Sequence, residues 1–269
     1  ILASGSSPSF DANKLNITSY LNPLVSYQYE PGSTMKIFSF MDAIEEGLYD
    51  GEETYQSGTI RVSDATIKDF NNVGWGRITF DDGFSYSSNV AATILSQRLG
   101  HDKLYDFYKK CGFGRKTGIS LPDEAEGKID FNYATEIATA AFGQGITTTP
   151  IQNIQALTML ANDGVMVKPY IVSKIVDGNT KTVKYTAERE ELGQIVSKST
   201  VDKMKTMMYD VVYSGKTDAR FFKSNLVTVM GKTGTAQIAN PNGGGYLTGN
   251  YDYIRSFATL FPYENPQYI

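Results

Sequence analysis

The sequence contains very little of the two residue types that most often bind metals and transfer protons. Its 269 residues include one cysteine and one histidine. A lone Cys111 excludes an internal disulfide, and we expect it to be a small, buried apolar side chain. This shortage argues against a zinc site and against Ser-His-Asp or Cys-His catalysis. His101 follows the expected end of a helix and is interpreted as a capping or surface residue.

Long apolar runs and an excess of basic charge are also missing. No stretch of about 18 apolar residues occurs, so the sequence predicts no membrane-spanning helix. The formal net charge is −4 and no run of Lys or Arg stands out, which argues against nucleic acid as a partner. Hydrophobic residues make up 41% of the chain, which is enough for the core of one large mixed domain.

Helical and strand-like patterns alternate along the chain. Apolar periodicity and capping residues predict helices over residues 34–46, 89–100, 149–161 and 199–213. The Met-rich stripe of the last helix is interpreted as core. Alternating or β-branched segments predict a hairpin from 165–176 and 180–185, and strands over 226–230, 235–238 and 254–261. Residues 1–30 read as irregular, and 51–83 as strand or loop.

Ser33 and Lys36 form a Ser-x-x-Lys pair at the start of the first predicted helix. Residues three apart share a helix face, so the Lys36 amine can reach the Ser33 hydroxyl. A serine nucleophile needs a base, and an amine can serve if burial or a nearby cation lowers its pKa. Taken alone, the pair reads as a capping serine and a surface lysine, because chance supplies about one such match in a chain of this length.

Two other short motifs also carry possible chemistry. Ser87-Ser88-Asn89 opens the second predicted helix and alone reads as an N-cap. Its functional interpretation has Ser87 relaying a proton and Asn89 bonding a substrate amide. The segment 232–235, Lys-Thr-Gly-Thr, interrupts a strand pattern with a glycine, which often marks the close approach of a ligand backbone. A substrate alongside this strand could be held by its main chain, with Lys232 and the threonines suited to a carboxylate.

Two similar patterns are set aside. Lys116-Thr117-Gly118 repeats the third tripeptide but lies in an expected surface loop soon after the second motif. Gly-Lys-Thr at 215–217 and 231–233 raises the alternative of a P-loop. That motif needs an earlier glycine where Asp210 and Leu226 stand, so nucleotide binding is not predicted.

Together and in this order, the three motifs resemble the signature of penicillin-binding proteins and serine β-lactamases. Their spacing and the flanking segments 29–36, 86–89, 142–145 and 231–237 are similar to class B penicillin-binding proteins, the monofunctional transpeptidases. Residues 242–246 further resemble the Gram-positive division-type members such as penicillin-binding protein 2x or 1. The resemblance extends over nearly the whole chain.

The resemblance implies an α/β fold of the α+β type, with a mainly antiparallel central sheet flanked by helices. The active site would lie between the sheet edge and a helical lobe. Residues 1–269 would be one transpeptidase domain, truncated at both ends relative to the family. The family location is the extracellular face of the bacterial cytoplasmic membrane, with anchoring by an N-terminal segment outside this sequence.

The resemblance also implies D,D-transpeptidase activity without a metal or cofactor. The implied partners are peptidoglycan stem peptides, β-lactam antibiotics and other cell-wall synthesis proteins. Ser33 would be the acylated nucleophile, Lys36 the general base and Ser87 the proton relay. The implied substrate-binding residues are Asn89, Lys232, Thr233, Gly234 and Thr235, and the backbone N–H groups of Ser33 and Thr235 would form the oxyanion hole.

Two alternatives share the acylation chemistry. A serine β-lactamase would also hydrolyse the acyl-enzyme quickly, but the class A pattern of a Glu followed four residues later by Asn is missing. A non-catalytic β-lactam sensor domain would be acylated without carrying out transpeptidation.

Overall fold

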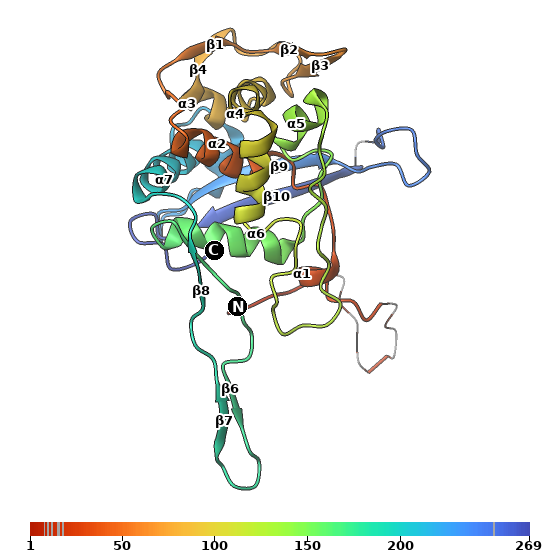
Figure 1. The fold of residues 1–269 in the computed structure, drawn as a ribbon, viewed down its shortest axis with the longest axis vertical. Coiled ribbons are helices and arrows are strands. Elements are labelled where there is room, and N and C mark those ends of the chain that lie inside the picture. Colours follow the sequence, from red (N-terminus) through yellow and green to blue (C-terminus); the bar gives the residue numbers. More distant parts are fainter. Residues whose placement is uncertain (8, 10, 12, 15–16, 18, 250) are drawn as a thin grey trace.

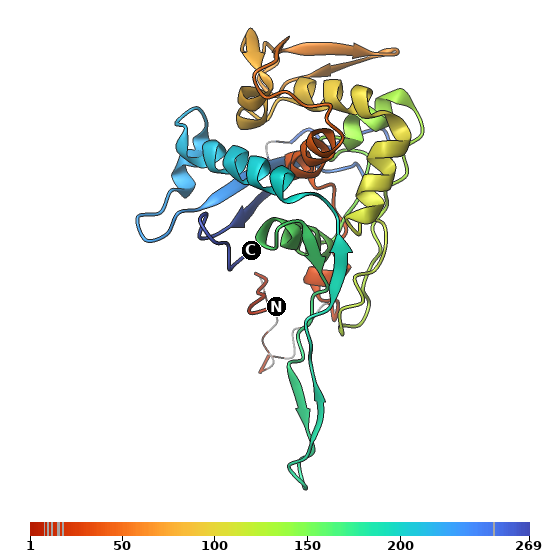
Figure 2. The same cartoon turned by 60° about the vertical axis from the view of Figure 1, so that its left-hand side comes forward.

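The computed structural model of the protein describes residues 1–7, 9, 11, 13–14, 17, 19–249 and 251–269. Figures 1 and 2 show a body of helices crossed by one strand pair, with a long hairpin projecting away from it. The helices are α1 (Pro23–Ser26), α2 (Lys36–Glu45), α3 (Phe80–Ser85), α4 (Asn89–Lys110), α5 (Ala134–Ala140), α6 (Pro150–Leu157) and α7 (Lys198–Tyr213), with 3₁₀ turns η1 (Gly32–Met35), η2 (Thr158–Ala161) and η3 (Asp218–Phe222).

The described strands form five antiparallel pairs. Helices cover the central pair, so the predicted α+β class with mainly antiparallel strands is confirmed. The strands are β1 (Thr54–Gln56), β2 (Thr59–Val62), β3 (Ala65–Lys68), β4 (Arg77–Thr79), β5 (Val165–Val167), β6 (Lys174–Val176), β7 (Val183–Thr186), β8 (Glu191–Gln194), β9 (Met230–Gln237) and β10 (Tyr253–Leu260).

Helix α2 forms the centre of the core. Its residues from Lys36 to Ala43 are all buried, and Ile37 and Met41 have no exposed surface. A helix buried on every side needs neighbours on every side, and α4 and α7 pack against it. The first turn of α2 therefore carries the Lys36 side chain into the protein interior.

The β9–β10 pair positions the third motif. Its register runs without interruption from Met230 opposite Leu260 to Gln237 opposite Tyr253. In both views the pair lies between α7 and α6. Within the residues that the structure describes, β9 pairs with β10 alone, and β9 also packs against η1. The η1 turn, which carries Ser33, therefore lies beside the strand that carries the Lys-Thr-Gly motif.

Several predicted elements are confirmed and others need correction. The helices predicted over 34–46, 149–161 and 199–213 are present, the first two with a 3₁₀ turn at one end. Gly100 has non-helical dihedral angles (φ 76°, ψ 178°), which agrees with the predicted break, but helix resumes and continues to Lys110. Helices α3 and α5 were missed, because six or seven residues give too short a periodic signal.

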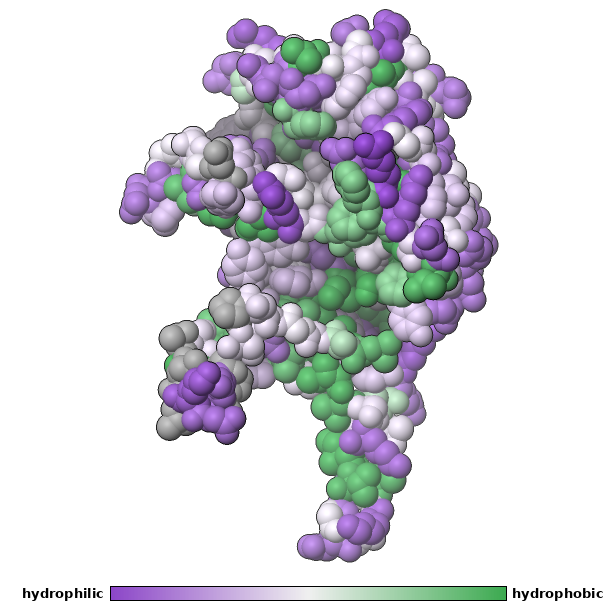
Figure 3. Space-filling model, turned by 180° about the vertical axis from the view of Figure 1, so that it is seen from behind, coloured by the Kyte–Doolittle hydropathy of each residue, from purple (hydrophilic) through white to green (hydrophobic). Residues whose placement is uncertain are grey.

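The predicted hairpin is only partly right. Residues 174–176 do pair with 183–186, but Val165–Val167 pairs with Glu191–Gln194 instead. The β6–β7 hairpin extends well away from the body (Figure 1), and apolar side chains gather along it in Figure 3. Among the described helices, none has the length and apolar character that a membrane span requires.

Candidate active site

The three sequence motifs meet at one cleft, although they come from distant parts of the chain. The cleft has a volume of about 940 Å³, and Ser33, Ser87, Asn89, Thr233 and Thr235 line it. The aromatic side chains of Trp75, Tyr86, Phe142, Phe222 and Tyr253 also line it, together with Lys216. The predicted residues thus surround a space that an extended peptide could enter.

Ser33 lies in η1, the turn that leads directly into α2. The turn begins with Gly32 in a left-handed conformation (φ 56°), where an added Cβ would meet the Thr235 carbonyl at 3.0 Å. On the other side, the Gly32 N–H donates to the Gly143 carbonyl at 3.0 Å. A Cβ on Gly143 would lie only 2.2 Å from the Gly32 oxygen. Close backbone packing therefore places the turn that carries Ser33 between residue 143 and β9.

Lys36 is fully buried beneath Ser33. Its Nζ lies 2.9 Å from Ser33 Oγ, 2.8 Å from Asn89 Oδ1, 2.6 Å from the Ser87 carbonyl and 3.3 Å from Ser87 Oγ. Burial lowers the pKa of Lys36 well below its ordinary value, and the Lys232 ammonium lowers it further, while Asp69 acts in the opposite direction. An amine can act as a base if its pKa is lowered, and burial and Lys232 both lower the pKa of Lys36.

The hydrogen-bond partners show where the lone pair of a neutral Lys36 amine must point. Asn89 Nδ2 donates to the Lys68 carbonyl at 2.9 Å, which fixes Asn89 Oδ1 toward Lys36. This oxygen and the Ser87 carbonyl can only accept, so they take the two N–H bonds of a neutral amine. The lone pair is left for a hydroxyl, and the Ser33 hydroxyl is nearer than that of Ser87.

The second motif sits where α3 turns into α4. Ser87 has a left-handed backbone (φ 61°), which is uncommon for a residue other than glycine. Its Oγ lies between two lysines, 2.8 Å from Lys232 Nζ and 3.3 Å from Lys36 Nζ. Ser88 caps α4 by accepting from the Ala91 N–H at 3.0 Å. The motif therefore contains the N-cap of α4, at Ser88, and also a hydroxyl at the cleft, that of Ser87.

The side chains of the third motif lie on both faces of strand β9. Thr233 and Thr235 line the cleft, whereas Lys232 is fully buried and reaches Ser87 from within. Burial lowers the pKa of Lys232 to about 7. Gly234 is not among the cleft-lining residues. A Cβ there would meet Ser256 Oγ at 2.4 Å, so a glycine is required for close packing against β10.

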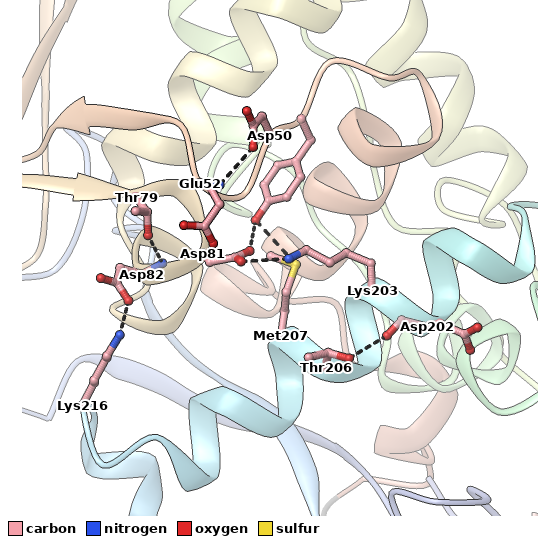
Figure 4. Close-up of polar contacts among 11 residues, drawn as sticks. Asp50, Glu52, Thr79, Asp81, Asp82, Asp202, Lys203, Thr206, Met207 and Lys216 are labelled. Atoms are coloured by element: carbon pink, nitrogen blue, oxygen red, sulfur yellow. Dashed lines mark hydrogen bonds and ion pairs between the residues drawn. The ribbon is translucent and has the colours of Figure 1, made fainter.

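Polar contacts tie α3, which precedes the second motif, to the region of α7. Asp81 accepts from Tyr49 Oη at 2.5 Å and from Lys203 Nζ at 2.8 Å. The contact between Asp81 and Lys203 is drawn in Figure 4. The neighbouring Asp82 accepts from Lys216, which also lines the cleft. These contacts connect two walls of the cleft through α3.

Residues outside the three motifs also contribute to the site. Asp69 and Lys216 were missed, because neither belongs to a motif and only the fold brings them near the cleft. The second Lys-Thr-Gly, at 116–118, does not line the cleft, and Thr117 is bonded to Glu124. Cys111 is buried as predicted.

Comparison with known proteins gives a consistent result. The family model described as "Penicillin binding protein transpeptidase domain" matches residues 1–269. Penicillin-binding protein PbpB of Mycolicibacterium smegmatis is 34% identical over 92% of this chain and 39% of its own length. Stage V sporulation protein D of Bacillus subtilis is 33% identical over 90% of this chain and 37% of its own length. The chain thus spans less than two fifths of these curated relatives.

Solved structures resemble the fold at similar identity. Penicillin binding protein 3 of Mycobacterium tuberculosis matches with a TM-score of 0.85 and 31% identity, covering 96% of this chain and 59% of its own. The same mycobacterial protein complexed with ampicillin also gives a TM-score of 0.85. Penicillin Binding Protein 2X of Streptococcus thermophilus matches with a TM-score of 0.85 and 31% identity, over 92% of this chain and 38% of its own.

Proposed function

Since the chain belongs to the penicillin-binding protein transpeptidase family, we propose that it is the catalytic domain of a peptidoglycan D,D-transpeptidase. One observation carries the proposal: a fully buried Lys36 amine lies 2.9 Å from the Ser33 hydroxyl, nearer than the 3.3 Å that separates it from the Ser87 hydroxyl. This is the arrangement that a serine nucleophile needs for activation without histidine.

In the acylation step, Ser33 Oγ attacks the carbonyl carbon of the penultimate D-Ala of a stem peptide while Lys36 takes the hydroxyl proton. The backbone N–H groups of Ser33 and Thr235 stabilise the oxyanion, each contributing about 10²–10³ in rate. The peptide C–N bond then breaks. Ser87, hydrogen-bonded to both lysines, passes a proton to the departing amine, and free D-Ala leaves an ester on Ser33.

Substrate binding is assigned to the cleft-facing groups. Asn89 orients a substrate amide at the cleft wall. The terminal carboxylate lies near Thr233 and Thr235, with the positive charge of Lys232 beneath it. Gly234 keeps this strand close to its neighbours, so a substrate main chain can extend along β9.

Deacylation completes the cross-link. An amine of a neighbouring stem peptide loses a proton to Lys36 and attacks the ester carbon. A new amide forms and the Ser33–acyl bond breaks, with its oxygen taking the proton back. A β-lactam ring opens on the same serine, but its nitrogen stays attached and continues to occupy the acceptor position, so the acyl-enzyme persists.

The wider setting follows from the family and is part of the proposal. Peptidoglycan cross-linking places the domain on the extracellular face of the cytoplasmic membrane, with an N-terminal anchor in the full protein. Other cell-wall synthesis proteins are proposed as partners.

The first test is acylation by labelled penicillin, followed by intact-mass measurement and peptide mapping. We expect one adduct per chain on Ser33, none in Ser33→Ala, and an unchanged adduct in Ser199→Ala, which alters an exposed serine on α7. The second assay measures D-Ala release from a stem peptide in the presence of an amine acceptor. Failure of the parent chain to form an adduct refutes the proposal. Loss of the adduct within seconds as hydrolysed penicillin indicates a β-lactamase, and acylation without D-Ala release indicates a sensor.

A further inference from the structure

Asp69, just after β3, is a buried carboxylate with an unusual set of partners. It is 1% exposed. Its Oδ1 accepts from Ser88 Oγ at 2.8 Å and from the Val90 N–H at 3.1 Å, and its Oδ2 accepts from the Gly58 N–H at 2.8 Å. Among the described residues, no Lys, Arg or His nitrogen forms an ion pair with it. Burying a charge without an ion-pair partner is costly, and here three hydrogen bonds compensate part of that cost.

The groups that Asp69 holds flank the residues of the second motif. Ser88 and Val90 are the two neighbours of Asn89, whose Oδ1 accepts from Lys36. Ser87, one residue earlier, has a left-handed backbone (φ 61°), which is uncommon for a residue other than glycine. Asp69 therefore fixes this turn at two points, Ser88 and Val90, and the first of these adjoins Ser87.

We propose that Asp69 is a positioning residue of the acylation site: its carboxylate holds the 87–90 turn against the Lys36 amine, and its charge sets how strongly that amine retains a proton. The inference rests on the proposed function, and it assigns to Asp69 a part in tuning the base as well as in shaping the turn.

The charges around Lys36 support the second half of this inference. Lys232 faces it from β9 and disfavours its protonated form, and Asp69 favours that form. The other side chains in contact with the amine are neutral: Ser33, Ser87, Asn89 and the Phe142 ring. Tyr55 of β1 is a neutral phenol whose pKa is raised mainly by burial and also by the charges of Asp69 and Asp82. Asp69 is thus the negative charge that opposes burial and Lys232 at the base.

A change in this balance has a measurable consequence. Acylation requires neutral Lys36, so its rate should rise with pH through the pKa of Lys36 and then level off. Removing the charge of Asp69 lowers that pKa and moves the rising limb to lower pH. If only the turn is loosened, the maximal acylation rate at high pH falls, but the pH at which the rate rises stays the same.

The experiment measures the penicillin acylation rate from pH 4 to 9 in the parent, Asp69→Asn and Ser88→Ala. Asp69→Asn should move the limb to lower pH by about one unit, the low end for a nearby opposite charge, and should also lower the plateau. Ser88→Ala keeps the charge and removes one hydrogen bond to it, so its plateau should fall about tenfold with the limb unmoved. Glu53→Gln, which alters a carboxylate paired with Arg98, should change neither.

Two results would overturn the inference while leaving the proposed function intact. One is a limb at the parental pH in folded Asp69→Asn, with folding checked by thermal melting. The other is a parental acylation rate in Ser88→Ala. This measurement tests the role of Asp69 even if Asp69→Asn does not fold. Absence of acylation in the parent would instead refute the proposed function, and the role of Asp69 with it.

Discussion

A carboxyl group inside the core should make the stability of the protein fall as pH rises. Asp42, on α2, is 2% exposed, and its Oδ2 has no hydrogen-bond partner among the residues that the structure describes. Burial, together with the nearby Glu46 carboxylate, raises the pKa of Asp42 from 3.8 to about 7, against the opposing effect of Lys110 and Lys103. Its favourable contribution, as the neutral acid, is complete below pH 4 and is lost as pH rises through 7.

The size of this effect follows from the two pKa values. Each pKa unit corresponds to 1.36 kcal/mol, so a shift from 3.8 to about 7 gives an upper limit of about 4 kcal/mol between pH 4 and pH 8. We therefore expect Asp42→Asn to be more stable than the parent by about 2–4 kcal/mol at pH 8, relative to their difference at pH 4. An asparagine cannot ionise, so it avoids the cost of a buried charge.

The assay is urea unfolding of the parent and Asp42→Asn at several pH values, and the quantity of interest is the difference between their free energies of unfolding. Other titrating groups are common to both proteins and cancel in that difference. Asp64→Asn, which changes a carboxylate in the exposed β2–β3 turn, is the matched control. Its free energy of unfolding should differ from that of the parent by the same amount at every pH. A difference between Asp42→Asn and the parent that stays constant from pH 4 to pH 8 would show that the carboxyl is not perturbed by burial.

Three further predictions concern the site. Lys36→Met should lower the penicillin acylation rate about 10²–10⁴-fold, because the group that accepts the Ser33 proton is lost. An acylation rate near the parental value would exclude Lys36 as the base. Noncovalent affinity for a substrate carboxylate should weaken as pH rises through about 7, because Lys232 loses its charge there. Equilibrium binding to the acylation-defective Ser33→Ala variant measures this affinity. Adding Lys232→Gln to that variant should make its affinity insensitive to pH. Gly143→Ala should abolish acylation, since the new Cβ would lie 2.2 Å from the Gly32 carbonyl, whereas Gly178→Ala meets nothing within 4 Å and should behave as the parent in the same assay.

The local part of the site could be predicted from the sequence. A spacing of three residues at a helix start was enough to bring Ser33 and Lys36 together, and the apolar pattern of residues 37–44 indicated a helix that would pack in the core. Capping preferences also placed an N-cap within residues 87–89, and the structure puts it at Ser88. The strands predicted over 226–230 and 235–238 need correction, because one strand, β9, runs from Met230 to Gln237 and carries Lys232 between them.

The remaining features depend on contacts between distant segments, which periodicity does not encode. Nothing around Asp69 in the sequence indicates that its carboxylate meets Ser88 and Val90. Likewise, Lys216 reaches the cleft only because α7 ends beside α3. The pairing of β5 with β8 was missed for a similar reason, since the nearer hairpin strand is the simpler partner in sequence.

The burial of α2 has a consequence for how the protein responds to heat and to mutation. Ser33 and Lys36, the proposed nucleophile and base, lie in η1 and the first turn of α2, and α2 is central to the core, so neither residue can shift without disturbing that packing. Reactivity toward penicillin should disappear in the same cooperative transition as the near-ultraviolet circular dichroism signal, with no folded but unreactive species in between. Substitutions in the core, far from the cleft, should therefore lower the fraction of protein that penicillin labels, in proportion to the fraction that they unfold.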